Sequence, residues 1–202
     1  HTVDAATGRV RKCYDALWEP GRPTWSPDGR FVALAAFRPV TPRYREGYSE
    51  ILVVDLANGR GRYHSVGAGK SIVTRGDDGP VWSPDGRHLA YVMGSTLWVL
   101  PVDATGAPSG PARQITSEVT DAPSWRGDSA ALLYQNNGRL RLVALAGGPA
   151  QTIPCPISWA AAKAPARTLV RAGRLWDGTG NSYARNADVV LDGNRIAAVR
   201  AA

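Results

Sequence analysis

The stretch Trp82-Ser83-Pro84-Asp85-Gly86, followed by the apolar run 87–93, decides the fold of this 202-residue chain. The pattern occurs in two further places, as Trp25-Ser26-Pro27-Asp28-Gly29 and, in divergent form, as Trp125-Arg126-Gly127-Asp128-Ser129. Apolar runs follow these copies too, at 30–36 and 130–134. A segment that recurs along a chain indicates a repeat architecture, in which each repeat is one supersecondary unit.

The sequence Ser-Pro-Asp-Gly has the chemistry of a type I turn. Ser opens the turn with a side-chain hydrogen bond, Pro presets φ at the second position, Asp tolerates the third, and Gly closes it. Short apolar runs on both sides of the turn predict a tight hairpin. The run after the turn is nearly continuous in Val, Leu, Ala and aromatic residues, which is typical of a strand covered on both faces.

Each repeat continues into a second apolar strand and a short polar strand. The apolar strands are expected at 51–56, 97–103 and 140–145, and the polar strands near 62–64, 113–115 and 151–153. Three to four short strands per repeat, separated by turns, describe one blade of a β-propeller. The spacing of 43 residues from Trp82 to Trp125 lies in the usual range for a blade, about 40–45. The longer spacing of 57 residues from Trp25 to Trp82 indicates extra loop.

Pro-x-Trp-Ser-Pro-Asp-Gly-Arg ahead of an apolar strand resembles the repeat of TolB-type propellers, also called the WD40-like or PD40 repeat. Pro23 and Pro80 provide the proline in the two full copies. The resemblance covers about residues 1–155. It implies a propeller that binds a partner, as a TolB-like scaffold does, and a periplasmic or secreted location.

The first residues match the end of a blade rather than its beginning. Val3-Asp4-Ala5-Ala6-Thr7-Gly8 is similar to Val102-Asp103-Ala104-Thr105-Gly106, so we expect the chain to start in mid-blade and to be a fragment of a larger protein. The predicted fold is all-β: a partial β-propeller of about three blades plus the end of a preceding one, followed by a small β-sandwich segment. Three blades cannot close a ring, so the isolated chain is expected to associate through its edges or to be only marginally folded.

The character of the sequence changes after residue 155. We predict propeller blades over 1–155, a linker over 156–166, and a separate segment of strands and tight glycine turns over 167–202. The stretch 168–180, which ends in Asp-Gly-Thr-Gly, and the hairpin 186–199 resemble the opening of amidohydrolase-superfamily enzymes. There these strands build a small β-sandwich beside a catalytic barrel.

The amidohydrolase resemblance implies that the parent protein hydrolyses an amide, cyclic amide or peptide-like C–N bond. A divalent metal such as zinc would be held in the barrel by a His-x-His pair and further ligands, where it lowers the pKa of a bound water. Residues 1–202 contain no such pair, because His1, His64 and His88 stand apart, and they contain no Cys-x-x-Cys or Gly-x-Ser-x-Gly. We therefore predict no catalytic, cofactor-binding or metal-binding residues in this segment.

The predicted function is that of a non-catalytic propeller and opening segment of a metal-dependent amidohydrolase, in which the propeller gates substrate or binds a partner. Its partners would be the rest of its own chain and a protein or peptide-like substrate. Two alternatives remain open. One is a TolB-like protein-binding scaffold with no enzymatic activity; the other is the propeller that caps prolyl-oligopeptidase-type serine hydrolases.

The charge of the chain adds little to this picture. The net charge is +7, but the basic residues are scattered and form no run, so nucleic acid is not expected as a partner. No apolar run reaches transmembrane length.

Four features keep more than one interpretation. Cys13 and Cys155 would either form a disulfide between the first and last blades or remain buried free thiols. The Arg- and Tyr-rich loop 38–48 is either a binding lip or a solvated connection. Gly69-Lys70-Ser71 lacks the upstream glycine of a phosphate-binding loop, and Asp77-Asp78 favours a polar turn over a cation site in the propeller channel.

Overall fold

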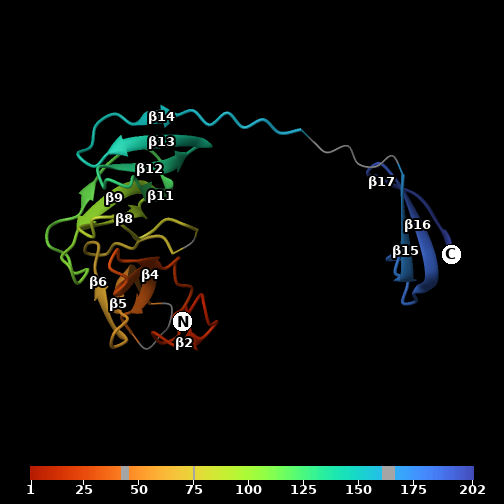
Figure 1. The fold of residues 1–202 in the computed structure, drawn as a ribbon, viewed down its shortest axis with the longest axis horizontal. Coiled ribbons are helices and arrows are strands. Elements are labelled where there is room, and N and C mark those ends of the chain that lie inside the picture. The colour runs from red at the N-terminus through yellow and green to blue at the C-terminus, as the bar shows by residue number, and fades with distance from the viewer. Residues whose placement is uncertain (42–45, 75, 161–166) are drawn as a thin grey trace. The chain divides into compact units, whose positions relative to one another are not determined.

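The computed structural model describes residues 1–41, 46–74, 76–160 and 167–202 (Figure 1). Parts of two predicted features, the loop 38–48 and the linker 156–166, lie outside these ranges, at 42–45 and 161–166. All regular elements in the described residues are strands, which confirms the all-β class, and no helix there is long and apolar enough to cross a membrane. The strands are β1 Thr2–Val3, β2 Val10–Arg11, β3 Thr24–Trp25, β4 Phe31–Pro39, β5 Gly47–Asp55, β6 Arg60–His64, β7 Val81–Trp82, β8 His88–Met93, β9 Thr96–Pro101, β10 Arg113–Gln114, β11 Asp121–Trp125, β12 Ala131–Asn136, β13 Arg139–Ala144, β14 Gln151–Ile153, β15 Arg167–Leu175, β16 Ala184–Asp192 and β17 Arg195–Ala201.

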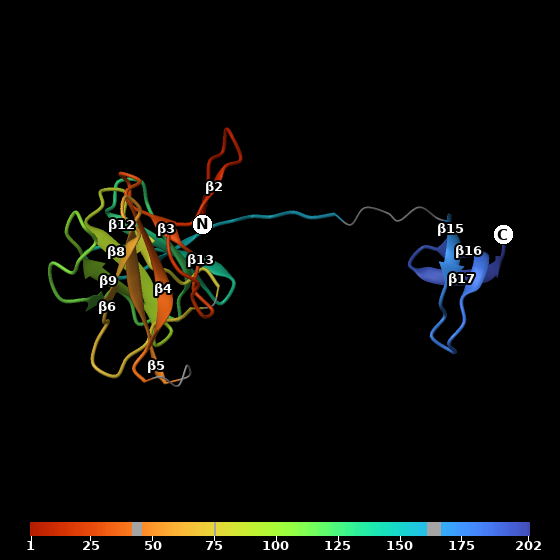
Figure 2. The same cartoon turned by 90° about the horizontal axis from the view of Figure 1, so that it is seen from below.

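The chain divides into two compact units, His1–Cys155 and Pro156–Ala202. The first unit contains three four-stranded antiparallel sheets, each a meander in chain order: β3-β4-β5-β6, β7-β8-β9-β10 and β11-β12-β13-β14. We call these sheets blades 1, 2 and 3. They stack face to face in chain order, as Figures 1 and 2 show, and this confirms the predicted partial propeller.

The Trp-Ser-Pro-Asp-Gly stretch forms the turn between the first and second strands of a blade, as its chemistry predicts. In blade 2 the Ser83 hydroxyl donates to Asp85 Oδ1 (2.6 Å) and accepts from the His88 amide (2.9 Å), and Asp85 Oδ1 also accepts from the Arg87 amide (3.1 Å). Gly86 has a φ of +73°, which a glycine adopts without strain. Ser26 and Asp28 repeat these contacts in blade 1.

The divergence of the third copy has a structural reason. Ser129 stands where the other copies have glycine and keeps the left-handed backbone, with a φ of +61°. It is buried, and its hydroxyl accepts a hydrogen bond from the Asp85 amide of blade 2 at 3.0 Å. The strained serine therefore ties two neighbouring blades together.

The core lies between the sheets. Blades 1 and 2 bury Phe31, Ile51, Val53, Trp82 and Tyr91 between them, among other apolar side chains. Blades 2 and 3 meet through a second cluster of apolar side chains: Ala90, Leu97, Val99, Leu132, Tyr134 and Val143. Because blade 2 is apolar on both faces, β8 and β9 read as nearly continuous apolar runs, as predicted.

The remaining strands form two smaller sheets. β1 and β2 pair only with each other among the described strands, with Thr2 opposite Arg11. In the second unit, β15, β16 and β17 make one antiparallel sheet. A sandwich needs two sheets, and the described residues of this unit supply one of them.

Candidate functional site

The three histidines lie at separate places in the first unit. His88 stands on β8, with its ring centroid 5.9 Å from that of Trp125, so it belongs to the interface between blades 2 and 3. His64 is half-buried on β6, and burial, helped by the nearby Arg62 charge, lowers its pKa. His1 is exposed at the N-terminus. Across residues 1–41, 46–74, 76–160 and 167–202, no three His, Cys, Asp or Glu side chains are grouped to hold a metal ion.

The two aspartates considered for a channel cation have structural roles instead. Asp77 pairs with Arg22 (Nη1–Oδ1, 3.1 Å), and Asp78 Oδ1 accepts from the Ala122 amide of blade 3 (3.0 Å). Burial raises the pKa of Asp78, and the neighbouring carboxylates of Asp121 and Asp77 raise it further. Arg22 and Asp77 line a cavity of about 360 Å³, together with residues from the first strand of each blade.

Two other sequence features also have structural explanations. The Lys70 ammonium, in the connection between β6 and β7, lies 5.5 Å from the centroid of the Trp98 ring of blade 2, a cation–π contact. Both cysteines are free, so the disulfide interpretation was wrong. The expectation of buried thiols needs correction as well, because Cys13 is half-buried and Cys155 is exposed. Cys155 follows β14, the last strand of blade 3, and so lies outside the packed sheets.

The residues that form a candidate binding site are arginines brought together by strand register. On β4, β5 and β6, Phe31 pairs with Asp55 and Asp55 with Arg60, while Ala33 pairs with Val53 and Val53 with Arg62. Side chains at alternate positions share one face of a sheet, so the cross-strand sets 31-55-60 and 33-53-62 lie on the same face. Phe31, Ala33 and Val53 pack against blade 2, so this face is the one toward blade 2. They border a cleft of about 110 Å³ lined by Arg30, Phe31, Val53, Asp55, Asn58, Arg60, Arg62 and Thr105, which we call the arginine cleft.

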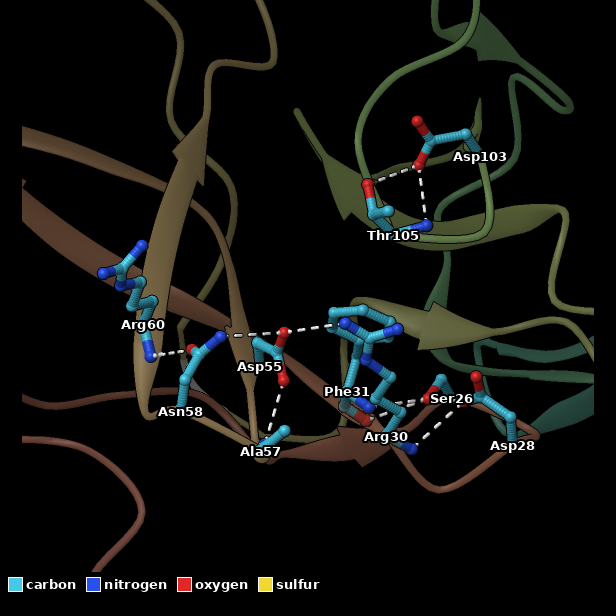
Figure 3. Close-up of polar contacts among 10 residues, drawn as sticks. All are labelled: Ser26, Asp28, Arg30, Phe31, Asp55, Ala57, Asn58, Arg60, Asp103 and Thr105. Atoms are coloured by element: carbon cyan, nitrogen blue, oxygen red, sulfur yellow. Dashed lines mark hydrogen bonds and ion pairs between the residues drawn. The ribbon is translucent and has the colours of Figure 1, made fainter.

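One wall of the arginine cleft is held rigidly by Asp55 (Figure 3). Its carboxylate accepts from the Ala57 amide (2.9 Å) and the Asn58 side chain (3.2 Å), and pairs with Arg30 (3.2 Å). Arg30 in turn lies over the Phe31 ring, 4.9 Å from its centroid. The hydrogen bond from the Ala57 amide lowers the pKa of Asp55, and the nearby Arg30 lowers it further, which together outweigh the desolvation that raises it. This carboxylate is therefore ionised at neutral pH.

The opposite wall is the turn after β9 in blade 2. Asp103 Oδ1 accepts from the Thr105 amide (2.8 Å) and hydroxyl (2.7 Å), which closes the turn and occupies that oxygen (Figure 3). Gly106 lets this turn approach blade 1, since a Cβ there would lie 2.9 Å from the Trp82 ring and 3.0 Å from Val53.

Two positive charges in the cleft are not compensated. Arg60 and Arg62 are exposed, and neither guanidinium has an ion-pair partner within the part of the chain that the structure describes. A guanidinium is a planar fork of donors that matches a carboxylate in bidentate geometry. The cleft is therefore suited to a small anionic group. The scattered arginines gave no sign of this in the sequence; the alternation Arg60-x-Arg62 on a predicted outer strand was the available signal.

Comparisons with known proteins give a likeness of fold. No protein-family model and no curated protein matches the sequence. Among solved structures, a protein assigned as TolB from Agrobacterium tumefaciens is 20% identical over 64% of this chain and 47% of its own, with a TM-score of 0.46. The β-propeller domain of the Trilobed protease from Pyrococcus furiosus is 13% identical, with coverages of 87% and 55% and a TM-score of 0.46. Pyrococcus horikoshii acylaminoacyl peptidase is 14% identical, with coverages of 85% and 27% and a TM-score of 0.47.

The chain spans less than two thirds of the length of each of these structures. At such identities and TM-scores the likenesses carry no argument about function, and the assignment of a propeller rests on the strand order itself. The resemblance of residues 167–202 to amidohydrolases stays a prediction.

Proposed function

We propose that the propeller unit is a non-catalytic binding module that holds an acidic segment of a partner protein in the arginine cleft. The observation that carries this proposal is the pair of uncompensated guanidinium groups, Arg60 and Arg62, on one face of β6. Both stand on a regular strand next to a turn that Asp55 and Asn58 hold in place. A rigid support of this kind reduces the ordering cost of binding a carboxylate.

The surroundings of the cleft favour a peptide carboxylate over a nucleic-acid backbone. A cleft of about 110 Å³ has room for one small anionic group and is not a groove that follows a chain of phosphates. The carboxylate of Asp55 borders it and would repel a run of phosphates. Its aromatic residue, Phe31, is only 4% exposed and lies beneath Arg30, so it is not available for stacking with a base.

Fluorescence anisotropy of a fluorescein-labelled glutamate-rich peptide tests this proposal with the 202-residue chain. We expect Arg60→Gln with Arg62→Gln to weaken binding by about tenfold or more, since each charged hydrogen bond contributes about 1.5–3 kcal/mol. The control, Arg139→Gln with Arg195→Gln, removes the same charge from two exposed positions that do not line the cleft. Equal losses in both double variants would mean non-specific attraction, and so would equal binding of a labelled oligothymidine; either result would overturn the proposal.

We further propose that the second unit is the opening segment of a metal-dependent amidohydrolase, with the propeller gating access to it. The support is the Asp-Gly-Thr-Gly turn, in which Asp177 Oδ1 accepts from the Thr179 amide (2.9 Å) and hydroxyl (2.7 Å), while Trp176 Nε1 donates to Gly180 O (2.6 Å). The same family resemblances support a periplasmic or secreted location. The residues described here form no metal site, so no metal-dependent step is assigned to them.

The coding region downstream of Ala202 tests this second proposal. A strand carrying a His-x-His pair soon after the hairpin would support it, and zinc analysis of the full protein would follow. A stop codon or further blades would overturn it without affecting the proposal for the arginine cleft.

A further inference from the structure

We propose that the acidic segment binds by adding a strand to the outer edge of β6, with acidic side chains at every second position opposite Arg60, Arg62 and His64. This inference rests on the proposed function of the arginine cleft and states how the partner is recognised. It makes the partner an extended peptide with alternating acidic residues.

β6 is an open edge of its sheet. It is the last strand in the order β3-β4-β5-β6 and pairs with β5 alone among the described strands, so one side of its backbone has no strand partner there (Figure 1). Unpaired backbone groups along a strand edge are a template for pairing with another extended chain. β6 therefore offers main-chain donors and acceptors to a peptide.

The outer edges of the other two blades are shorter and are guarded by proline. β10 has two residues and β14 has three, whereas β6 has five and contains no proline. Pro111 and Pro149 stand two residues before β10 and β14, at the position that Arg60 occupies in blade 1. Short edge strands and prolines prevent pairing at sheet edges. Blades 2 and 3 have both devices, and β6 has neither.

Arg62 also differs from its counterpart in blade 2. The same register position holds Arg62 in blade 1 and Arg113 in blade 2, each opposite a valine of the preceding strand. The Arg113 guanidinium joins two blades, because it donates to the Leu145 carbonyl of blade 3. Arg62 makes no such hydrogen bond within the described part of the chain, so its donors are available to a ligand.

His64 is a further departure from the repeat. Isoleucine holds the corresponding position in the other blades, as Ile115 and Ile153. Ile115 is 6% exposed in the core between blades 2 and 3. The Nε2 atom of His64 is buried and has no hydrogen-bond partner among the described residues. Packing at this position does not need a polar ring, and a group of the ligand would pair with the free nitrogen.

The spacing of the three side chains defines the partner. Alternate residues of a strand share one face and stand about 6.8 Å apart along it. An extended peptide has the same repeat, so acidic residues at every second position lie opposite Arg60, Arg62 and His64. Opposite charges on neighbouring strands stabilise their pairing. One carboxylate then fills the arginine cleft, and the others lie along its rim.

Two labelled peptides of identical composition test this inference by fluorescence anisotropy with the 202-residue chain. One alternates, as Thr-Glu-Thr-Glu-Thr-Glu-Thr, and the other groups its glutamates, as Thr-Thr-Glu-Glu-Glu-Thr-Thr. We expect the alternating peptide to bind about fivefold or more tightly, because only this peptide places every carboxylate on the face of the basic side chains.

N-methylation of the alternating peptide tests the main-chain hydrogen bonds. Methyl groups on the glutamate amides, or instead on the threonine amides, give two peptides of equal charge. The amides of alternate residues in a strand point to opposite edges, so only one of the two sets removes donors toward β6. We expect about a tenfold loss of affinity for that set and little change for the other, which is its matched control.

A charge exchange tests the register from the side of the protein. Arg62→Glu should weaken binding of the alternating peptide by about tenfold or more, and lysine in place of the central glutamate should restore it. Arg139→Glu, at an exposed position that does not line the cleft, should change neither affinity. Circular dichroism shows whether each variant is folded, and the comparisons between peptides need no variant.

Equal binding of the grouped and alternating peptides, or equal losses in the two N-methylated peptides, would overturn strand addition. If Arg60→Gln with Arg62→Gln still weakened binding in that case, the arginine cleft would stand as a site for a single carboxylate. Absence of binding by every peptide would overturn both proposals, and the arginines of β6 would then only protect the edge from other strands.

Discussion

Replacement of Ser83 by alanine tests whether the turn chemistry of the repeat stabilises the propeller. The side chain is completely buried, and its hydroxyl makes two hydrogen bonds, donating to Asp85 Oδ1 and accepting from the His88 amide. A methyl group makes neither bond. Because Ser83 is not exposed to water, solvent cannot replace the lost acceptor, and the His88 amide is left unpaired.

The size of the effect follows from the two lost bonds. A buried donor without a partner costs about 1–3 kcal/mol. The loss at Asp85 adds less, because this carboxylate lies near solvent and keeps the Arg87 amide as a donor. Desolvation raises the pKa of Asp85, but the hydrogen bonds from Ser83 and Arg87 outweigh it, so the pKa lies below its ordinary value and the group stays ionised and hydrated at neutral pH. We expect a loss of about 2 kcal/mol in the free energy of unfolding.

Differential scanning calorimetry and urea unfolding followed by circular dichroism measure this loss. For a chain of this size, about 2 kcal/mol corresponds to a fall in Tm of about 4–8 °C. Ser117→Ala is the matched control, because Ser117 is exposed and its hydroxyl has no hydrogen bond within the described residues. A Tm for Ser83→Ala within about 1 °C of the parent would refute the reasoning that the turn hydroxyl is needed.

Three further substitutions test contacts between and within blades. Gly106→Ala should lower stability by about 2–4 kcal/mol in urea unfolding, because its φ of +76° strains an L residue and its Cβ meets the Trp82 ring; an unchanged midpoint would contradict the close approach. Glu118→Gln should lower the Tm at pH 7, since the hydrogen bond and charge of Arg141 lower the pKa of Glu118. This stabilisation is present above pH 4.5, so the difference in Tm from the parent should close as the pH falls through the lowered pKa; a difference independent of pH would point to packing alone. Asp78→Asn should raise the Tm at pH 7, since burial and neighbouring carboxylates raise the pKa of Asp78 and its charged form opposes folding. The gain in Tm should vanish below pH 3.8, where Asp78 of the parent is protonated too, and a lower Tm at pH 7 would show that the charge is needed.

Part of the fold was predictable because its signals are local. The Ser-Pro-Asp-Gly turn and the apolar runs beside it act within a few residues, so they predicted the second and third strands of each blade and the order of strands in the sheets. The turn 83–86 is an example, since its hydrogen bonds join residues no more than five positions apart.

The binding site was not predictable in the same way. Arg30 and Arg60 lie thirty positions apart in sequence, and only the pairing of β4, β5 and β6 places them in one cleft. Ser129 ends the divergent third copy of the turn, and its hydroxyl accepts a hydrogen bond from a turn that lies 44 residues earlier, in blade 2. The exposure of Cys155 likewise depends on where the last blade ends in space.

By itself the sequence determined the repeat, the turns and the all-β class, because backbone preferences and side-chain periodicity act between neighbours along the chain. Only the tertiary structure decided which charges meet in the arginine cleft and which side chains join neighbouring blades. The physical reason is that these properties depend on strand register and on sheet-to-sheet packing, where the partners of a residue come from a different repeat.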